Sequence, residues 1–119
     1  MYDRFNRAIT YLRVSVTDRC NLRCIYCKGA ARFIPKRHED MLTYEAIRDI
    51  VRESSRLGFT KIRLTGGEPL LKRNFAEVYM RAKARGLLVS VFTNATLVSE
   101  DLLDLFEALP PMHVEVSLY

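Results

Sequence analysis

The three cysteines of this 119-residue chain lie close together, at positions 20, 24 and 27 of the segment RCNLRCIYCKG. Thiolates are the ligands that iron–sulfur clusters, zinc and copper prefer in proteins. An odd number of cysteines argues against a framework of paired disulfides. The spacing of Cys20, Cys24 and Cys27 therefore predicts a metal site or a reactive thiol.

Two kinds of metal site fit three clustered cysteines. Structural zinc takes four ligands in a closed tetrahedron, usually as two separated pairs. The chain has no second cysteine pair, so His38 would have to be the fourth ligand, although its surroundings, PKRHED, are typical of a solvated loop. A cubane iron–sulfur cluster can instead bind three thiolates and leave its fourth iron open to an outside ligand. The cysteine count favours the cluster, with zinc as the alternative.

Strand and helix patterns alternate along the whole chain. Leu12, Val14 and Val16 alternate with polar residues, which predicts a half-buried strand over residues 12–16. Helical spacing then begins after Thr43 and again after Asn74, which are both expected N-caps, and Ser99 starts a third helix. The remaining predicted elements are a helix at 43–58, a strand at 61–65, a helix at 74–86, a strand at 87–92, a helix at 99–109 and a strand at 113–118.

This order predicts an α/β fold of parallel βα units joined by right-handed crossovers. The last predicted strand would present an unpaired edge at residue 119, because parallel sheets normally continue until both faces are covered. We therefore expect residues 1–119 to form one domain that is the N-terminal portion of a larger core. Self-association that completes the sheet is the alternative.

A second motif, TGGEP at residues 65–69, follows the strand predicted at 61–65. Alone, it would read as an ordinary turn, because Gly and Pro mark loops in most proteins. In combination with a CxxxCxxC motif that carries Tyr26 before its last cysteine, it resembles the radical S-adenosylmethionine (radical SAM) superfamily. The resemblance covers essentially the whole chain and implies the first half, about four strands, of a partial TIM-type barrel.

The resemblance implies a 4Fe-4S cluster bound by Cys20, Cys24 and Cys27, with S-adenosylmethionine chelating the open iron. It further implies reductive cleavage of S-adenosylmethionine to a 5'-deoxyadenosyl radical, which abstracts hydrogen from a substrate. The electron would come from a donor such as flavodoxin or ferredoxin. Direct ligation of the cosubstrate suits this chemistry, because it fixes the geometry of electron transfer.

The resemblance also implies a set of residues that bind the cosubstrate. Gly66 and Gly67 lack a Cβ, so their backbone can approach the methionine group closely, and Glu68 is expected to pair with its ammonium group. Tyr26 is expected near the adenine. Asn94 and Ser117, late in their strands, are expected to contact the nucleoside, and the alternative is that these polar residues only close their strands.

Three further residues are implied to bind the substrate. The stretches LRVSVTDRCNLRCIYC and FTKIRLTGGEPL resemble the GTP-cyclising enzymes of molybdopterin synthesis, which implies that Arg13 and Arg63 face a triphosphate or purine. The arginine fork suits a phosphate, but the alternative is an arginine that lines the barrel and pairs with a carboxylate. Thr93 is likewise implied to contact the substrate, or else only closes its strand.

The C-terminal third of the chain departs from the cyclase pattern. Ala95 stands where a glycine is expected, and residues 82–119 resemble the radical enzymes that carry a SPASM extension. We therefore interpret the chain as part of an enzyme for peptide modification or cofactor maturation, which acts on a peptide or small-molecule substrate. The alternatives are a GTP-cyclising enzyme and a non-catalytic iron–sulfur or zinc-binding fragment.

The composition of the chain indicates which class of partner it binds and where in the cell it lies. The net charge of +5 comes from scattered basic residues without interleaved aromatic residues, which argues against nucleic acid and favours a solvated helical surface. An anionic substrate or an acidic partner is the alternative. No run approaches the roughly 18 to 20 apolar residues of a membrane span, and residues 1–13 lack the pattern of a signal peptide. We therefore predict a cytoplasmic protein with no membrane partner.

Overall fold

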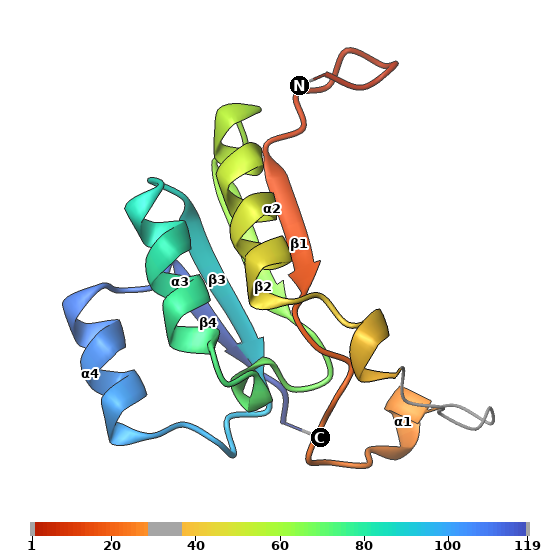
Figure 1. Cartoon of the computed structure of the whole chain (residues 1–119), viewed down its shortest axis with the longest axis vertical. Coiled ribbons are helices and arrows are strands. Elements are labelled where there is room, and N and C mark those ends of the chain that lie inside the picture. The colour runs from red at the N-terminus through yellow and green to blue at the C-terminus, as the bar shows by residue number, and fades with distance from the viewer. Residues whose placement is uncertain (1, 29–36, 119) are drawn as a thin grey trace.

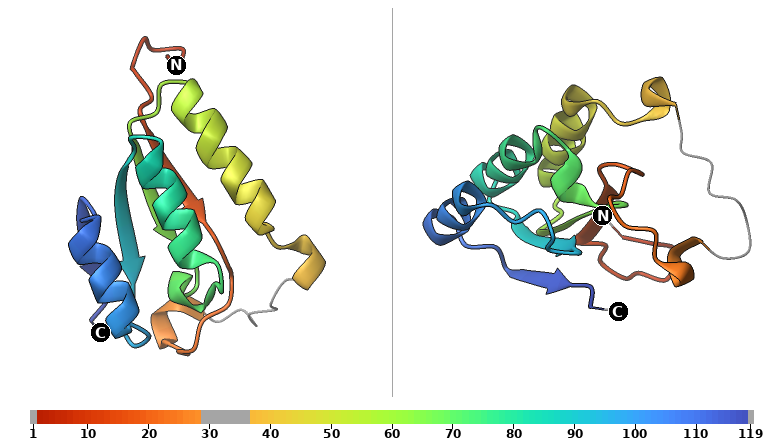
Figure 2. Two further views of the ribbon diagram at one scale, coloured as in Figure 1. Left: turned by 60° about the vertical axis from the view of Figure 1, so that its left-hand side comes forward. Right: turned by 90° about the horizontal axis from the view of Figure 1, so that it is seen from below.

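The computed structural model describes residues 2–28 and 37–118, which form a parallel sheet with helices on one face (Figures 1 and 2). The strand order is β1-β2-β3-β4, and every neighbouring pair is parallel. The predicted α/β fold of parallel βα units is therefore confirmed. The strands are β1 (Tyr11–Ser15), β2 (Lys61–Thr65), β3 (Leu88–Thr93) and β4 (His113–Val116).

Three longer helices follow β1, β2 and β3 and cover the same face of the sheet, as Figure 2 shows. They are α2 (Tyr44–Arg56), α3 (Phe75–Ala84) and α4 (Glu100–Ala108), and three short turns complete the elements: α1 (Ile25–Lys28), η1 (His38–Asp40) and η2 (Pro69–Leu71). None of the helices in the described ranges is long and apolar enough to cross a membrane.

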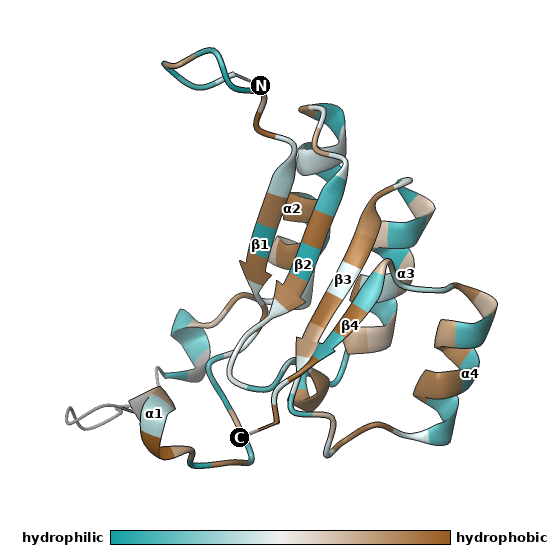
Figure 3. Ribbon diagram, turned by 180° about the vertical axis from the view of Figure 1, so that it is seen from behind, coloured by the Kyte–Doolittle hydropathy of each residue, from teal (hydrophilic) through white to brown (hydrophobic). Residues whose placement is uncertain are grey.

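Period-2 alternation decides which side chains face the helices. Ile62 and Leu64 of β2 are almost fully buried beneath the helices, whereas Arg63 between them points to the opposite face. Among the described residues, α2, α3 and α4 leave that opposite face uncovered, and Figure 3 shows hydrophobic and hydrophilic residues in alternation along β1 and β2. The core therefore lies entirely between the sheet and its single layer of helices.

The core consists of apolar side chains from the strands, from residues beside them and from the three longer helices. Tyr79 is fully buried among apolar neighbours, and its hydroxyl donates to the carbonyl of Leu109. Burial raises the pKa of Tyr79 to about 12, so the phenol keeps its proton even at an alkaline pH that would ionise an exposed tyrosine. The buried apolar residues are Val14, Val16, Ile47, Val51, Ile62, Leu64, Phe75, Val78, Tyr79, Ala82, Leu87, Val89, Val91 and Leu102.

One of the two predicted helix caps, Thr43, is confirmed, and Ser99 caps the helix that it was expected to start. The side chains of Thr43 and Ser99 accept hydrogen bonds from the backbone N–H groups of Ala46 and Leu102. Asn74 lies at the predicted N-cap of α3, but its side chain makes no capping bond, so that part of the prediction is wrong. Its backbone dihedrals, φ −96° and ψ 23°, depart from the extended conformation that the other two caps adopt.

The loop after β1 and the loop after β2 run against each other beyond the ends of their strands. The backbone N–H of Gly67 donates to the carbonyl of Thr17 at 2.8 Å, and that of Glu68 donates to the carbonyl of Arg19 at 2.7 Å. A Cβ on Gly66 would lie 2.3 Å from the oxygen of Thr17, and one on Gly67 would lie 2.3 Å from the oxygen of Arg19. Both glycines are therefore required by the close approach of the two loops.

We predict that Gly67→Ala destabilises the protein strongly, because its Cβ would overlap a backbone oxygen that cannot move without displacing the loop after β1. Overpacking typically costs about 1–3 kcal/mol, and we expect a loss at the upper end of that range because the clash is with backbone. Urea unfolding followed by circular dichroism measures the loss. Gly58→Ala is the matched control: a Cβ there meets nothing within 4 Å, so only its φ of +85° is unfavourable, at about 1 kcal/mol. Equal losses in the two variants would contradict the steric argument.

Candidate functional site

The carboxyl ends of the strands enclose a cavity of about 160 Å³. Parallel βα folds build their sites at this edge of the sheet, because all strands end there. Every predicted site residue lines the cavity except Arg13, Arg63 and Glu68. The lining residues are Cys20, Leu22, Cys24, Tyr26, Cys27, Gly66, Gly67, Phe92, Thr93, Asn94 and Ser117.

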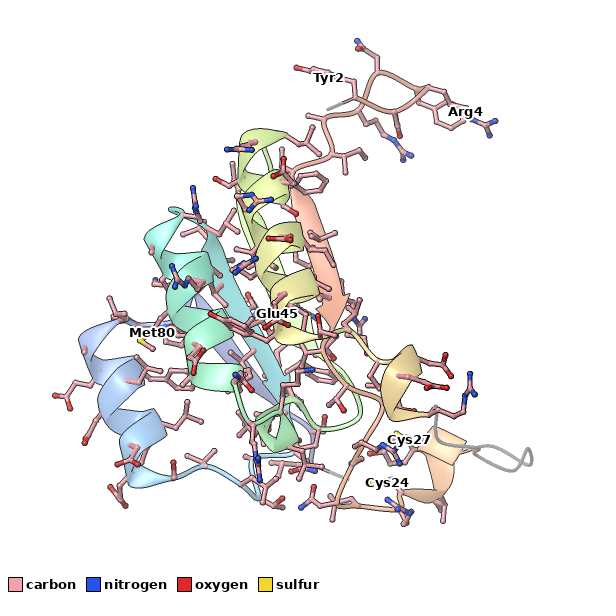
Figure 4. All side chains as sticks on the ribbon, viewed as in Figure 1. Tyr2, Arg4, Cys24, Cys27, Glu45 and Met80 are labelled. Atoms are coloured by element: carbon pink, nitrogen blue, oxygen red, sulfur yellow. The ribbon has the colours of Figure 1, made fainter. Side chains whose placement is uncertain are left out.

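The cysteine segment continues from the loop after β1 into the short helix α1, which the sequence patterns did not predict. Cys24 directly precedes α1 and Cys27 lies within it, and the backbone N–H of Cys27 donates to the carbonyl of Cys24 at 3.2 Å. Figure 4 shows both residues on the segment below the ends of the strands. The three cysteines are free thiols, two of them half-buried and Cys27 exposed.

The thiols surround the cavity and do not meet at one point. Within the described residues, no group of three His, Cys, Asp or Glu side chains is arranged to hold a single metal ion. A 4Fe-4S cluster does not require such an arrangement, because each thiolate ligates a different iron. Three unpaired thiols around one cavity therefore fit the cluster. The side chain of His38, the alternative zinc ligand, lies outside the described part of the chain.

Glu68 is the most deeply buried ionisable group at the site, with none of its surface exposed. Its Oε1 accepts the Thr93 hydroxyl at 2.6 Å and the Leu70 N–H at 3.0 Å, and its Oε2 accepts the Asn94 N–H at 2.7 Å. These bonds tie the TGGEP loop to the end of β3. Its predicted pairing with the ammonium group of S-adenosylmethionine stays a prediction.

The loop after β3 is held in an unusual conformation around residue 95. Ala95 has a φ of 60°, in the left-handed region that favours glycine. Its N–H donates to the hydroxyl of Thr93 at 3.0 Å. The Thr93 hydroxyl is therefore committed to Glu68 and Ala95, although Thr93 lines the cavity. A role for Thr93 in substrate binding stays a prediction, and the observed contacts describe a residue that shapes the loop.

Two hydrogen-bonding residues of the site were missed by sequence reasoning. Asn21 and Thr96 bond to each other at 2.8 Å, and each also bonds to Asn94. They join the cysteine segment to the loop after β3, which lies more than 70 residues later in the sequence. The sequence offered one indication of their role, which is that Asn21 follows Cys20 and Thr96 follows Ala95. No local pattern, however, reveals a contact between residues so far apart in the sequence.

Arg13 and Arg63 lie side by side on the uncovered face of the sheet, outside the cavity. They are register partners on β1 and β2, and Arg13 is exposed. Arg63 pairs with Glu115 of β4, whose Oε1 also lies 3.1 Å from the Nε2 of His113. The Nε of Arg63 is buried without a hydrogen-bond partner among the described residues. For Arg63, the predicted alternative of a barrel-lining arginine paired with a carboxylate therefore describes what is observed.

A larger cavity of about 530 Å³ lies beside the N-termini of α2 and α3. Thr17, Lys72 and Asn74 are among its lining residues, and none of the predicted site residues is. Size alone would favour this cavity, but the three thiols and the glycine loop belong to the smaller one. The chemistry of the lining therefore identifies the cavity at the strand ends as the candidate site.

We predict that Glu68→Ala destabilises the protein by about 3 kcal/mol or more, because it leaves three donors unpaired at a cost of about 1–3 kcal/mol each. Glu68→Gln keeps one acceptor oxygen and is expected to cost less. Urea unfolding measures both losses. Glu77→Gln, on the exposed surface of α3, is the control and is expected to stay within about 0.5 kcal/mol of the unmodified protein. A small loss in Glu68→Ala would show that the buried bonds contribute little.

We predict that Ala95→Gly stabilises the chain by up to about 1 kcal/mol, because glycine adopts a φ of 60° without the steric cost of a Cβ. Thermal unfolding measures the gain. Ala76→Gly, within α3, is expected to lower stability by about 1 kcal/mol, since glycine is unfavourable inside a helix. A loss of stability in Ala95→Gly would contradict the strain assigned to residue 95.

Known proteins resemble this chain in sequence and in fold. Residues 14–119 match the Radical SAM superfamily. A GTP 3',8-cyclase of Clostridium botulinum (strain Hall) is 39% identical over 119 residues, which are 99% of this chain and 37% of that protein. The chain thus spans little more than a third of the length of that relative.

Two solved structures share the fold. The crystal structure of Streptococcus suis SuiB bound to precursor peptide SuiA has a TM-score of 0.77 and 18% identity, and covers 92% of this chain and 24% of SuiB. That of BtrN in complex with AdoMet and 2-DOIA has a TM-score of 0.75 and 21% identity, and covers 92% of this chain and 46% of BtrN. These likenesses support the four strands as part of a TIM-type parallel barrel. Together with the match over residues 14–119 and its paired cysteine and glycine motifs, they show that the chain belongs to the radical SAM superfamily.

Proposed function

We propose that residues 1–119 form the cluster- and cosubstrate-binding portion of a radical SAM enzyme. The observation that supports this proposal is that three free thiols, the glycine loop and the ends of β3 and β4 line the same cavity. Enzymes of this superfamily use a 4Fe-4S cluster and S-adenosylmethionine. When bound, the cluster supplies the electron that cleaves the cosubstrate and yields a 5'-deoxyadenosyl radical.

Different residues of the chain would bind the cluster and the two parts of the cosubstrate. Cys20, Cys24 and Cys27 would hold the cluster, and the exposed backbone of Gly67 would face the methionine part of the cosubstrate. Tyr26 and Ser117 line the same cavity and would contact its nucleoside. All of these groups are held by loops at one edge of a rigid sheet, which keeps the reacting centres in a fixed relation.

Two classes of substrate fit the chain. GTP is supported by the 39% identity to a GTP 3',8-cyclase, and by the exposed Arg13 on the uncovered sheet face, where a phosphate could pair with it. A peptide is the other class, as expected from the resemblance of residues 82–119 to enzymes with a SPASM extension. The identity to the cyclase covers 99% of the chain and makes GTP the better supported substrate.

The proposal also requires a source of electrons. A low-potential donor such as flavodoxin or ferredoxin is the class of partner that a 4Fe-4S cluster needs for its one-electron reduction. Such donors are abundant in the cytoplasm, where reducing conditions also keep thiols available as ligands. We propose both the donor and the cytoplasmic location on these grounds.

We predict that the chain, reconstituted with iron and sulfide under anaerobic conditions, gains a 4Fe-4S cluster whose reduced EPR signal changes on addition of S-adenosylmethionine. Cys24→Ala is expected to lose the cluster, because two thiolates leave two irons unprotected. Glu68→Gln is expected to keep the cluster but to bind S-adenosylmethionine more weakly. Iron content, visible absorption and EPR spectra measure these outcomes, and Glu77→Gln serves as the control for Glu68.

Several outcomes would contradict the proposal. Tight tetrahedral zinc in place of a cluster would favour the zinc-binding alternative. A cluster whose EPR signal ignores S-adenosylmethionine would leave only a non-catalytic iron–sulfur fragment. Unchanged affinity for S-adenosylmethionine in a folded Glu68→Gln variant would remove the role assigned to that carboxylate.

The substrate class is tested by binding, which does not require a complete catalytic barrel. Isothermal titration of the chain with GTP is expected to show an affinity that falls at least about tenfold in Arg13→Ala, since an arginine–phosphate pair is worth about 1.5–3 kcal/mol. Arg48→Ala, on the outer surface of α2, is the control. Absence of GTP binding together with binding of a peptide would overturn the assignment of GTP.

A further inference from the structure

The cysteine segment is fastened to the loop after β3 by a closed ring of side-chain hydrogen bonds. The Nδ2 of Asn94 donates to the Oδ1 of Asn21 at 3.0 Å, and the Nδ2 of Asn21 donates to the hydroxyl of Thr96 at 2.8 Å. The hydroxyl of Thr96 completes the ring by donating to the Oδ1 of Asn94 at 2.7 Å. Each of the three side chains therefore donates once and accepts once.

The ring fixes which way the Asn94 amide points. Its Oδ1 also accepts the backbone N–H of Thr96 at 3.0 Å, and a backbone N–H can only donate, so this atom must be the oxygen. The Nδ2 must therefore face the cysteine segment. Its second hydrogen is directed at Cys20, with 3.8 Å between Nδ2 and Sγ.

The backbone of Asn94 is anchored as firmly as its side chain. Its N–H donates to the fully buried carboxylate of Glu68 at 2.7 Å. The sulfur of Cys20 also receives the backbone N–H of Leu22 at 3.4 Å. One thiol thus accepts two N–H donors, and the donor from Asn94 is a side chain that mutation can remove.

Hydrogen bonds to a ligand sulfur stabilise the more negative, reduced state of an iron–sulfur cluster and so raise its reduction potential. We propose that Asn94 is a positioning residue that donates to the thiolate of Cys20 and raises the reduction potential of the cluster. This inference rests on the proposed function, because it needs the cluster to be bound at Cys20. It gives Asn94 a role distinct from the predicted contact with the nucleoside.

The test is an EPR-monitored titration of the reconstituted chain with dithionite, in the absence of S-adenosylmethionine. Without the cosubstrate, a lost nucleoside contact cannot alter the result. Asn94→Ala is expected to keep its iron content and shift the midpoint potential to a more negative value. Asn94→Asp is expected to shift it further in the same direction, because a carboxylate oxygen would replace the donor that faces Cys20.

Thr96→Val provides the matched control. It removes the hydroxyl from the ring but keeps the Nδ2 of Asn94 and its backbone anchor to Glu68, so a smaller shift than in Asn94→Ala is expected. Circular dichroism confirms folding, and Asn94→Asp preserves the side-chain shape if Asn94→Ala does not fold. An unmodified chain that binds no cluster would overturn the proposed function. A bound cluster with the same midpoint potential in both Asn94 variants would overturn this inference alone.

Discussion

The site depends on the contact between two backbone segments, residues 17–19 and 66–68. Their hydrogen bonds continue the pairing of β1 and β2 beyond the strand ends, and they place the start of the cysteine segment against the TGGEP loop. The contact exists only because Gly66 and Gly67 have no Cβ to occupy the space between the chains. Glycine was expected here for the approach of a ligand, and it is needed first for the approach of the protein to itself.

Glu68 extends this constraint to the third strand. A carboxylate has about four acceptor positions, and Thr93, Leu70 and Asn94 use three of them. One position is left for a further donor such as an ammonium group, which would have to reach a side chain with none of its surface exposed. The buried acid therefore acts on the cavity through Thr93 and Asn94, the two lining residues that it holds in place.

Local patterns predicted the strands and helices of the fold but not the contacts that join their loops. Period-2 alternation around Val14 and the capping signal at Thr43 depend on near neighbours, and the structure confirms both. The bond from Thr93 to Glu68 depends on strand register across 25 residues, which composition and spacing do not encode. Arg63 shows the same limit, because its carboxylate partner, Glu115, comes from a strand 52 residues later. Sequence alone thus identified the groups without their partners.

The hydrogen bond from Asn94 to Cys20 implies a compromise in the chemistry of the site. A cluster that must reduce a sulfonium delivers its electron more readily at a lower potential, whereas a donor loads the electron more readily at a higher one. An N–H directed at the ligand sulfur raises the potential of the cluster. It therefore favours electron transfer from the donor to the cluster and disfavours electron transfer from the cluster to the sulfonium. Because Glu68 fixes the backbone of Asn94, a carboxylate that does not touch the sulfur still determines where that N–H points. With a cluster bound at Cys20 and the role proposed for Asn94, the balance between accepting and delivering the electron would be set by the same hydrogen-bond network that holds the loops together.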